Sequence, residues 1–93
     1  MYTLRYHPRV ADHDLKKIPT ASRARIARAI EERLVTEPER FGAPLAGALG
    51  GYWKLRVGDY RVVFRIGARD VWILAVVHRK DVYERASRRR GCE

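Results

Sequence analysis

Four basic side chains flank the dipeptide Gly58-Asp59 at even spacings. Lys54 and Arg56 precede it, and Arg61 and Arg65 follow it. The forked N–H donors of arginine match the oxygens of a phosphate group, and cations placed together stabilise negative charge that develops during a reaction. This spacing therefore favours the binding of an anion, or chemistry at a phosphate.

Alternation of polar and apolar residues around this dipeptide predicts an antiparallel hairpin. Its strands are residues 52–57 and 60–66, and Gly58 at the first position of a two-residue loop indicates a type II′ turn. Successive side chains of a strand point to opposite faces, so the register defines two faces. The apolar face consists of Trp53, Leu55, Val57, Tyr60, Val62 and Phe64. The opposite face, which we call the basic face, consists of Tyr52, Lys54, Arg56, Arg61, Val63 and Arg65.

In this register Arg56 lies directly opposite Arg61. Like charges opposite each other in an antiparallel pair destabilise it by up to roughly 1 kcal/mol. A bound anion would compensate for the repulsion. The alternative is a solvated charged face from which both arginines extend into water. The pairing favours the anion site, since selection for stability alone would place an acidic or neutral side chain at one of the two positions.

A second group of polar side chains follows the apolar segment 71–77, which predicts a central strand covered on both faces. If that strand lies beside the hairpin, His78, Arg79 and Tyr83 could converge on the basic face. Each has a structural alternative. His78 could hydrogen-bond the backbone at the strand end, Arg79 could pair with Asp81, and Tyr83 could cap the core with its ring.

The two groups together resemble a known family. The segment WKLRVGDYRVVF at residues 53–64, followed by HRKDVY at residues 78–83, is similar to the RelE branch of the RelE/ParE toxin superfamily. The segment PLAG at residues 44–47 resembles the loop before the hairpin in that family. The resemblance implies an α+β, microbial-ribonuclease-like fold. It also implies a type II toxin: a ribosome-dependent endoribonuclease that cleaves mRNA in the A site, blocks translation and is neutralised by a cognate antitoxin.

The resemblance also implies roles for individual residues. The catalytic positions of the family correspond to Lys54, Arg61, Arg79 and Tyr83. Contacts with RNA or phosphate are expected from Arg56, Arg65, His78 and Lys80. In one departure, Tyr52 stands where well-studied members carry a second lysine. Two alternative functions stay open. One is a DNA gyrase inhibitor like ParE, which shares the fold; the other, which the Tyr52 departure supports, is a catalytically weak homologue that acts only as an antitoxin-binding module.

Cleavage of RNA without a metal needs a base for the ribose 2′-hydroxyl, cations for the phosphorane and an acid for the departing 5′-oxygen. The basic face carries no acidic side chain that could bind Mg²⁺, which favours this route. We accordingly expect no cofactor and no metal site.

The overall charge agrees with a polyanionic partner. Twenty Lys and Arg against eleven Asp and Glu give a net charge of +9, typical of proteins that bind nucleic acid or an acidic protein.

No segment approaches the ~20 consecutive apolar residues of a membrane span, and the N-terminus has no apolar signal core. We expect a cytoplasmic protein of a bacterium or archaeon that contacts no membrane. The single cysteine, Cys92, excludes an intramolecular disulfide.

Ninety-three residues predict a single domain, 1–93, with a basic, flexible tail from about residue 86. The expected order is a strand over residues 2–7, a helix over 9–18, a helix from the N-cap Thr20 to near Glu37, and a loop over 38–51. Asp12 and Asp14 suit the start of the first helix, where its dipole favours acids.

The expected fold class is α+β: an N-terminal strand, a two-helix hairpin, and a three-stranded antiparallel meander with a short C-terminal helix or tail. We expect the free toxin to be monomeric and to form a hetero-oligomer with its antitoxin.

Overall fold

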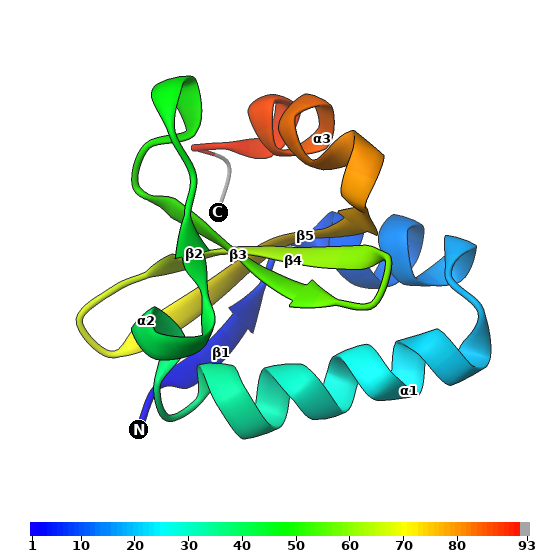
Figure 1. The fold of residues 1–93 in the computed structure, drawn as a ribbon, viewed down its shortest axis with the longest axis horizontal. Coiled ribbons are helices and arrows are strands. Elements are labelled where there is room, and N and C mark those ends of the chain that lie inside the picture. Colours follow the sequence, from blue (N-terminus) through cyan, green and yellow to red (C-terminus); the bar gives the residue numbers. More distant parts are fainter. Residues whose placement is uncertain (92–93) are drawn as a thin grey trace.

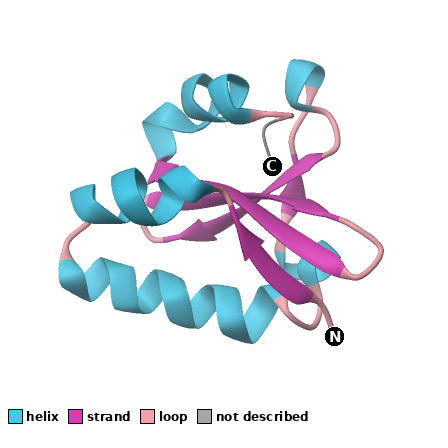
Figure 2. Ribbon diagram, turned by 180° about the vertical axis from the view of Figure 1, so that it is seen from behind, coloured by secondary structure: helices cyan, strands magenta, loops and turns pink. Residues whose placement is uncertain are grey.

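The computed structural model describes residues 1–91, which form a five-stranded sheet with helices on both faces (Figure 1). The strands are β1 (Thr3–Tyr6), β2 (Ala43–Pro44), β3 (Tyr52–Val57), β4 (Tyr60–Ile66) and β5 (Asp70–His78). Their order in the sheet is β1-β5-β4-β3-β2; β1 runs parallel to β5 and the other neighbours are antiparallel. Helix α1 (Thr20–Ala29) crosses one face, and α3 (Val82–Arg89) covers part of the other (Figure 2). The predicted α+β class is confirmed. Among these residues no helix is long and apolar enough to cross a membrane.

Each face of the sheet has its own hydrophobic core. On the α1 side, Ile26, Ile30 and Leu34 pack against the apolar side of the hairpin, where Leu55 and Phe64 are buried. On the α3 side, two residues of the helix pack on buried residues of the strands and of the segment before β3: Val82 and Ala86 with Leu45, Leu49, Tyr52, Val63, Leu74, Ala75 and Val77. Two apolar layers explain why β5 is apolar on both faces.

The predicted hairpin is confirmed in every pair of its register, including Arg56 opposite Arg61 and Lys54 opposite Val63. Gly58 has a φ of +60°, and among the described residues only glycines have a positive φ. A positive φ at the first turn position alone is the backbone of a type II′ turn. The residue pattern around the turn, with glycine at its first position, is therefore sufficient to predict the register of this hairpin.

Segment 71–77 is an interior strand, as predicted, but it is not the central one. β5 lies between β1 and β4, and β4 occupies the middle of the sheet. The difference arises because residues 43–44, expected to be loop, add the edge strand β2. There Ala43 and Pro44 pair with Lys54 and Trp53. A proline is accommodated because this is the edge of the sheet.

The remainder of the expected loop 38–51 also contains structure. A short helix, α2 (Pro38–Phe41), begins at a proline, which suits the first position of a helix. A 3-10 turn, η4 (Gly47–Leu49), places Leu49 in the core.

The helix expected over residues 9–18 is irregular. A π-helical turn, η1 (Val10–Asp14), is followed by a 3-10 turn, η2 (Leu15–Lys17). Val10, Asp14 and Ile18 are buried. Asp14, expected near the start of a regular helix, is the last residue of η1, and its side chain has no exposed area.

The second helix begins one residue earlier than expected. Thr20 is the first residue of α1, and Pro19 takes the capping position. The hydroxyl of Thr20 accepts a hydrogen bond from Arg23 instead of capping a backbone amide. After Ala29 the helix continues as the π-helical segment η3 (Ile30–Leu34).

The C-terminal segment is a helix, and the prediction of a flexible tail from residue 86 is wrong for residues 86–89. These residues belong to α3, in which Ala86 and Arg89 are buried. A 3-10 turn, η5 (Arg79–Asp81), connects β5 to this helix. Cys92 and Glu93 lie outside the described residues.

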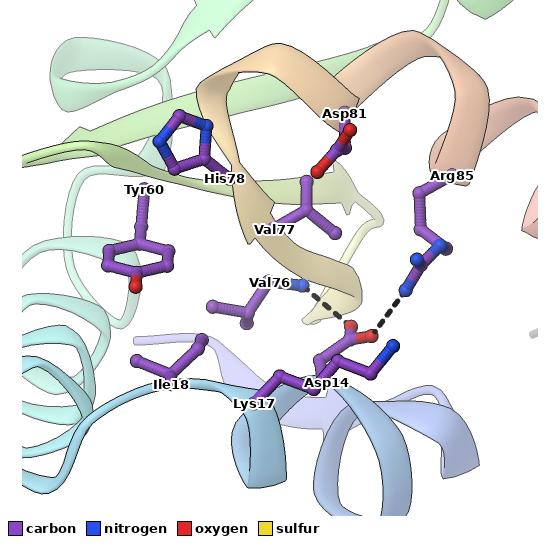
Figure 3. A pocket seen from close by; sticks show the side chains of 9 residues that line it. All are labelled: Asp14, Lys17, Ile18, Tyr60, Val76, Val77, His78, Asp81 and Arg85. Atoms are coloured by element: carbon purple, nitrogen blue, oxygen red, sulfur yellow. Dashed lines mark hydrogen bonds and ion pairs between the residues drawn. The ribbon is translucent and has the colours of Figure 1, made fainter.

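The edge of β5 is completed by side chains where β1 ends. β1 pairs with β5 only as far as Ile73, so the following backbone groups need other partners. The Val76 amide donates to the Asp14 carboxylate at 2.9 Å (Figure 3). The Leu74 carbonyl accepts from Arg89 at 3.3 Å. A carboxylate and a guanidinium thus stand in for a neighbouring strand.

The same two side chains bind each other. Two nitrogens of Arg89 donate to the two carboxylate oxygens of Asp14 at 2.6 and 2.7 Å. Arg85 adds a hydrogen bond to Asp14 at 3.1 Å, and His13 lies 3.2 Å from it. This Asp14 network ties η1, β5 and α3 together, and so holds α3 on the sheet.

Two opposed effects act on the pKa of Asp14. Burial raises it, because the charged form loses hydration. Hydrogen bonds from Arg89, the Val76 amide and His13, with the charge of Arg89, outweigh burial and hold the pKa below its usual value of 3.8. A lowered pKa means that the carboxylate stabilises the fold above its unfolded-state pKa. This contribution is lost as the pH falls through the lower folded-state pKa.

We expect Asp14→Asn to lower the free energy of unfolding at neutral pH by about 3–5 kcal/mol, because the buried Arg89 guanidinium would lose its counter-charge. The stability of the unmodified protein should decline below about pH 4, and the stability of the variant should decline less, because asparagine does not titrate. Urea denaturation followed by circular dichroism at descending pH measures both effects.

Asp12→Asn is the matched control. Asp12 belongs to the same turn but is more than half exposed and lies 3.9 Å from an exposed arginine, Arg9. Such a surface pair contributes about 0–1 kcal/mol. Equal losses of stability in the two variants would contradict the role of Asp14.

Candidate functional site

The hairpin turn and the end of β5 lie side by side. The amide of Arg79 donates to the carbonyl of Asp59 at 2.9 Å, and Tyr60 pairs with His78 across the two strands. Since η5 and α3 follow directly, their first residues start beside the turn. Two segments that are some twenty residues apart in the sequence are thereby joined at this end of the sheet.

Arg61 is half-buried, and its guanidinium turns back onto the hairpin. Its Nη1 donates to the carbonyls of Gly58 at 3.0 Å and Tyr60 at 2.9 Å. These bonds draw the side chain toward the turn, which explains how a like-charged neighbour at Arg56 is tolerated. An arginine has five N–H donors, so the group keeps donors for a ligand while its position is fixed.

Lys54 lies on the same face as Arg61. It is half-buried, opposite Val63 on β4 and Ala43 on β2. Lys54 and Arg61 are diagonal neighbours in the register, a relation that places Cβ atoms about 7–8 Å apart. Both side chains are long enough to reach one anion between them.

Tyr83, in the first turn of α3, is 55% exposed. Val82 and Ala86 point to the sheet, and residues seven apart on a helix share a side. Arg90, seven residues after Tyr83, donates to the carbonyl of Ala48, so this side of α3 faces η4. Tyr83 therefore lies on the η4 side of the helix, in the first turn after the segment that bonds to the hairpin turn, and its side chain is accessible.

Tyr52, at which the sequence suggested a departure from the family pattern, has a structural role. It is buried, and its hydroxyl accepts a hydrogen bond of 3.1 Å from the Gly91 amide. Tyr52 thus fixes the end of α3 over the beginning of β3.

His78 does not join the basic face. Its ring packs edge-on against Tyr60, with 6.0 Å between ring centroids, on the α1 side of the sheet (Figure 3). Its Nδ1 accepts a hydrogen bond from the Lys80 amide at 3.2 Å. His78 therefore bonds the backbone at the end of its strand, which was the structural alternative for this residue. The ring lines a hollow of about 150 Å³ that Asp14 and Lys17 also line.

The three remaining predicted contacts are dispersed. Arg56 is exposed and lines a hollow of about 120 Å³ with residues of α1 and η3: Arg25, Arg28, Ala29, Glu32 and Arg33. Arg65 lies four residues beyond Arg61 on β4, about 13 Å away at the rise of a strand. Lys80 is exposed in η5.

The basic face is therefore divided. Away from the turn it is covered by α3 and η4, where Tyr52 and Val63 are buried. Toward the turn, Lys54 and Arg61 are diagonal neighbours, and the backbone of Arg79 is bonded to the turn, so the first turn of α3 with Tyr83 starts close by. The cations Lys54 and Arg61 can together bind a phosphate. Among residues 1–91 no three His, Cys, Asp or Glu side chains are placed to hold a metal ion.

The positioning residues Asp14 and Arg89 could not be identified from the sequence. They are separated by 75 residues, and Arg89 stands within a run of three arginines that is typical of a tail. No local pattern marks such a pair.

Comparison with known proteins places the chain among toxins. Residues 4–83 match the sequence model of the family described as ParE toxin of type II toxin-antitoxin system, parDE. Toxin RelG of Mycobacterium tuberculosis is 38% identical over 86 residues, covering 90% of this chain and 98% of the relative. Toxin RelE of the same organism is 35% identical over 75 residues, covering 78% of this chain and 77% of the relative.

Solved structures agree. The toxin-antitoxin complex RelBE2 of M. tuberculosis contains a chain with a TM-score of 0.77 and 36% identity, covering 86% of this chain and 93% of that chain. A chain of the RelB-RelE antitoxin-toxin complex of Methanococcus jannaschii has a TM-score of 0.64 at 24% identity, covering 86% and 95%, and supports the fold.

Proposed function

The chain belongs to the RelE/ParE family of type II toxins, and from this premise we propose that it is an endoribonuclease that cleaves mRNA in the ribosomal A site. The observation that supports the proposal is the placement of Lys54 and Arg61 as diagonal neighbours on the hairpin, with the backbone of Arg79 bonded to the turn and Tyr83 following it in the first turn of α3. These are the four positions to which the family resemblance assigns catalysis.

The proposed reaction is an internal transfer at phosphorus. The ribose 2′-oxygen loses its proton to a base and attacks the phosphorus, and the bond to the 5′-oxygen breaks as that oxygen gains a proton. The products are a 2′,3′-cyclic phosphate and a 5′-hydroxyl. Lys54 and Arg61 stabilise the phosphorane, Arg79 contacts the phosphate or leaving group, and the Tyr83 hydroxyl handles the 2′-proton or orients the nucleotide.

The openness of this surface suits a ribosomal substrate. Tyr83 and Arg79 are exposed, so these groups lie at the surface and are accessible to a large substrate. A bound mRNA held by the ribosome would then provide the geometry that a deep active site provides elsewhere. Arg56, Arg65, His78 and Lys80 remain proposed RNA contacts; His78 would have to act from the α1 side of the sheet.

Inhibition of DNA gyrase is the second candidate, favoured by the ParE family match. The ribonuclease is favoured by two relatives named RelG and RelE and by the presence of the four residues to which the resemblance assigns catalysis. The weak-homologue alternative rests on Tyr52. Its hydrogen bond to Gly91 supports a role in holding α3 rather than a direct role in cleavage.

We also propose a cognate antitoxin as partner, as in the RelBE2 complex of the M. tuberculosis relative. A net charge of +9 should attract an acidic antitoxin segment to the hairpin end. The free toxin would be a monomeric single domain, and the neutralised form a hetero-oligomer in the cytoplasm, where ribosomes act.

We expect Arg61→Gln to abolish mRNA cleavage, because glutamine keeps a donor for the turn carbonyls but lacks the charge. Primer extension on mRNA from cells that express the chain measures the new 5′ ends. Arg69→Gln is the matched control, since Arg69 is exposed in the β4–β5 turn, away from the hairpin end. Cleavage by Arg61→Gln at the unmodified rate would remove Arg61 from the reaction. If the unmodified chain instead leaves mRNA intact and abolishes DNA supercoiling by gyrase, the gyrase alternative would be supported.

We expect Tyr83→Phe to slow cleavage in a reconstituted translation reaction by at least about tenfold, within the range that general acid–base groups contribute. The hydroxyl is needed for proton transfer or phosphate contact, whereas the ring suffices for stacking. Tyr6→Phe, which alters another half-exposed tyrosine, should leave the rate unchanged. If Tyr83→Phe retains the full rate, Tyr83 only stacks or packs.

We expect the purified chain to bind RNA with an affinity that falls steeply as salt rises, and the antitoxin complex to lose this binding. Fluorescence anisotropy with a labelled oligonucleotide measures both. A complex that leaves Lys54, Arg56 and Arg61 exposed and binds RNA undiminished would contradict neutralisation by occlusion.

A further inference from the structure

A hollow between the N-terminal segment and α3 is lined entirely by basic side chains. It measures about 360 Å³, which accommodates a phosphate group. Its lining comprises two histidines and four arginines: His7, Arg9, His13, Arg85, Arg88 and Arg89. We call it the basic hollow. None of these residues belongs to the sites expected from the sequence.

The carboxylates near the basic hollow are already engaged or weakly held. Asp14 lies behind it, fully buried, and both its oxygens accept from Arg89. Glu84 pairs with Arg88 at 3.1 Å, and Asp12 lies 3.9 Å from Arg9. All four side chains of the last two pairs are more than half exposed, and such pairs contribute about 0–1 kcal/mol, so an anion can replace them.

The back wall of the basic hollow is preorganised. Arg89 is fixed by Asp14 and by the Leu74 carbonyl, and Arg85 is fixed by Asp14 through its Nη1. Because the Asp14 network already orders Arg85 and Arg89 in the free chain, a ligand that binds their remaining N–H donors loses less conformational entropy. Arg9 and Arg88 form an exposed rim around this wall.

The basic hollow is separate from the hairpin end. Arg85 and Arg88 follow Tyr83 by two and five residues, which places them about 200° and 140° around α3 from it at 3.6 residues per turn. The two surfaces therefore occupy opposite sides of the same helix. A ligand that reaches both must be longer than one phosphate group.

We propose that the basic hollow binds a backbone phosphate of RNA, at a point separate from the phosphate that reacts. The proposal rests on the proposed function, which brings the chain to RNA, and extends it with a second contact. Four arginines around an open hollow suit a phosphodiester, whose two free oxygens accept forked donors. This contact raises affinity and sets the orientation of the chain without taking part in cleavage.

The test uses the double variant Arg9→Gln/Arg88→Gln, which removes the exposed rim and leaves the Asp14 network intact. The matched control is Arg40→Gln/Arg69→Gln. It removes the same net charge at exposed sites elsewhere, including one arginine, Arg40, that also pairs with an exposed carboxylate, at 3.0 Å. The probe is a fluorescent 2′-O-methyl RNA oligonucleotide, which cannot be cleaved, titrated at several salt concentrations.

We expect the rim variant to bind this RNA about tenfold more weakly. The slope of log affinity against log salt should fall by about 0.7 for each phosphate that the variant no longer neutralises. The control should keep the affinity of the unmodified chain within about twofold, since distant exposed charges are screened. In translation reactions the rim variant should raise KM and leave kcat unchanged. Equal weakening in both double variants would overturn the proposal, because net charge alone would then account for the binding.

Inorganic phosphate distinguishes the source of the ligand. If phosphate raises the melting temperature of the unmodified chain but not of the rim variant, while both bind RNA equally, the basic hollow takes free phosphate and the RNA proposal fails. Loss of RNA binding in the rim variant supports the proposal even if the chain cleaves no mRNA. Cleavage with unchanged RNA affinity and KM would overturn it and leave the proposed function standing.

Discussion

The fold depends on one buried carboxylate. β1 pairs with only part of β5, and Asp14 completes the exposed edge by accepting the Val76 amide while binding Arg89 with both oxygens. Because Arg89 belongs to α3, the same contact holds that helix on the sheet. An unpaired guanidinium in this position would be a buried charge without a partner, so neither residue can be lost alone. The second hydrophobic core and the placement of Tyr83 follow from this attachment.

Features set by neighbouring residues were predictable, and features set by distant ones were not. The hairpin register follows from alternation and from Gly58, so the diagonal relation of Lys54 and Arg61 could be derived from the sequence. The side on which His78 lies could not, because β5 is apolar on both faces and its pattern does not distinguish them. Asp14 and Arg89 meet only through the tertiary fold, and each alone resembles an ordinary surface charge. β2 is too short to leave a pattern.

Positioning α3 connects the fold to the proposed chemistry. One side of the helix carries Tyr83 toward the hairpin end, where Arg61 is fixed by the turn carbonyls. The other side carries Arg85 and Arg89 into the basic hollow. Tyr52 fixes the end of the helix through the Gly91 amide. Tyr52 thus helps to hold the helix that carries Tyr83.

The central claim is that this chain cleaves mRNA through attack by the 2′-oxygen. The most direct measurement is mass spectrometry of the fragment ends from a reconstituted translation reaction with one defined mRNA and the purified chain. The account predicts an upstream fragment that ends in a 2′,3′-cyclic phosphate and a downstream fragment that begins with a 5′-hydroxyl. Translation that stops with intact mRNA, or a downstream fragment with a 5′-phosphate, would contradict it.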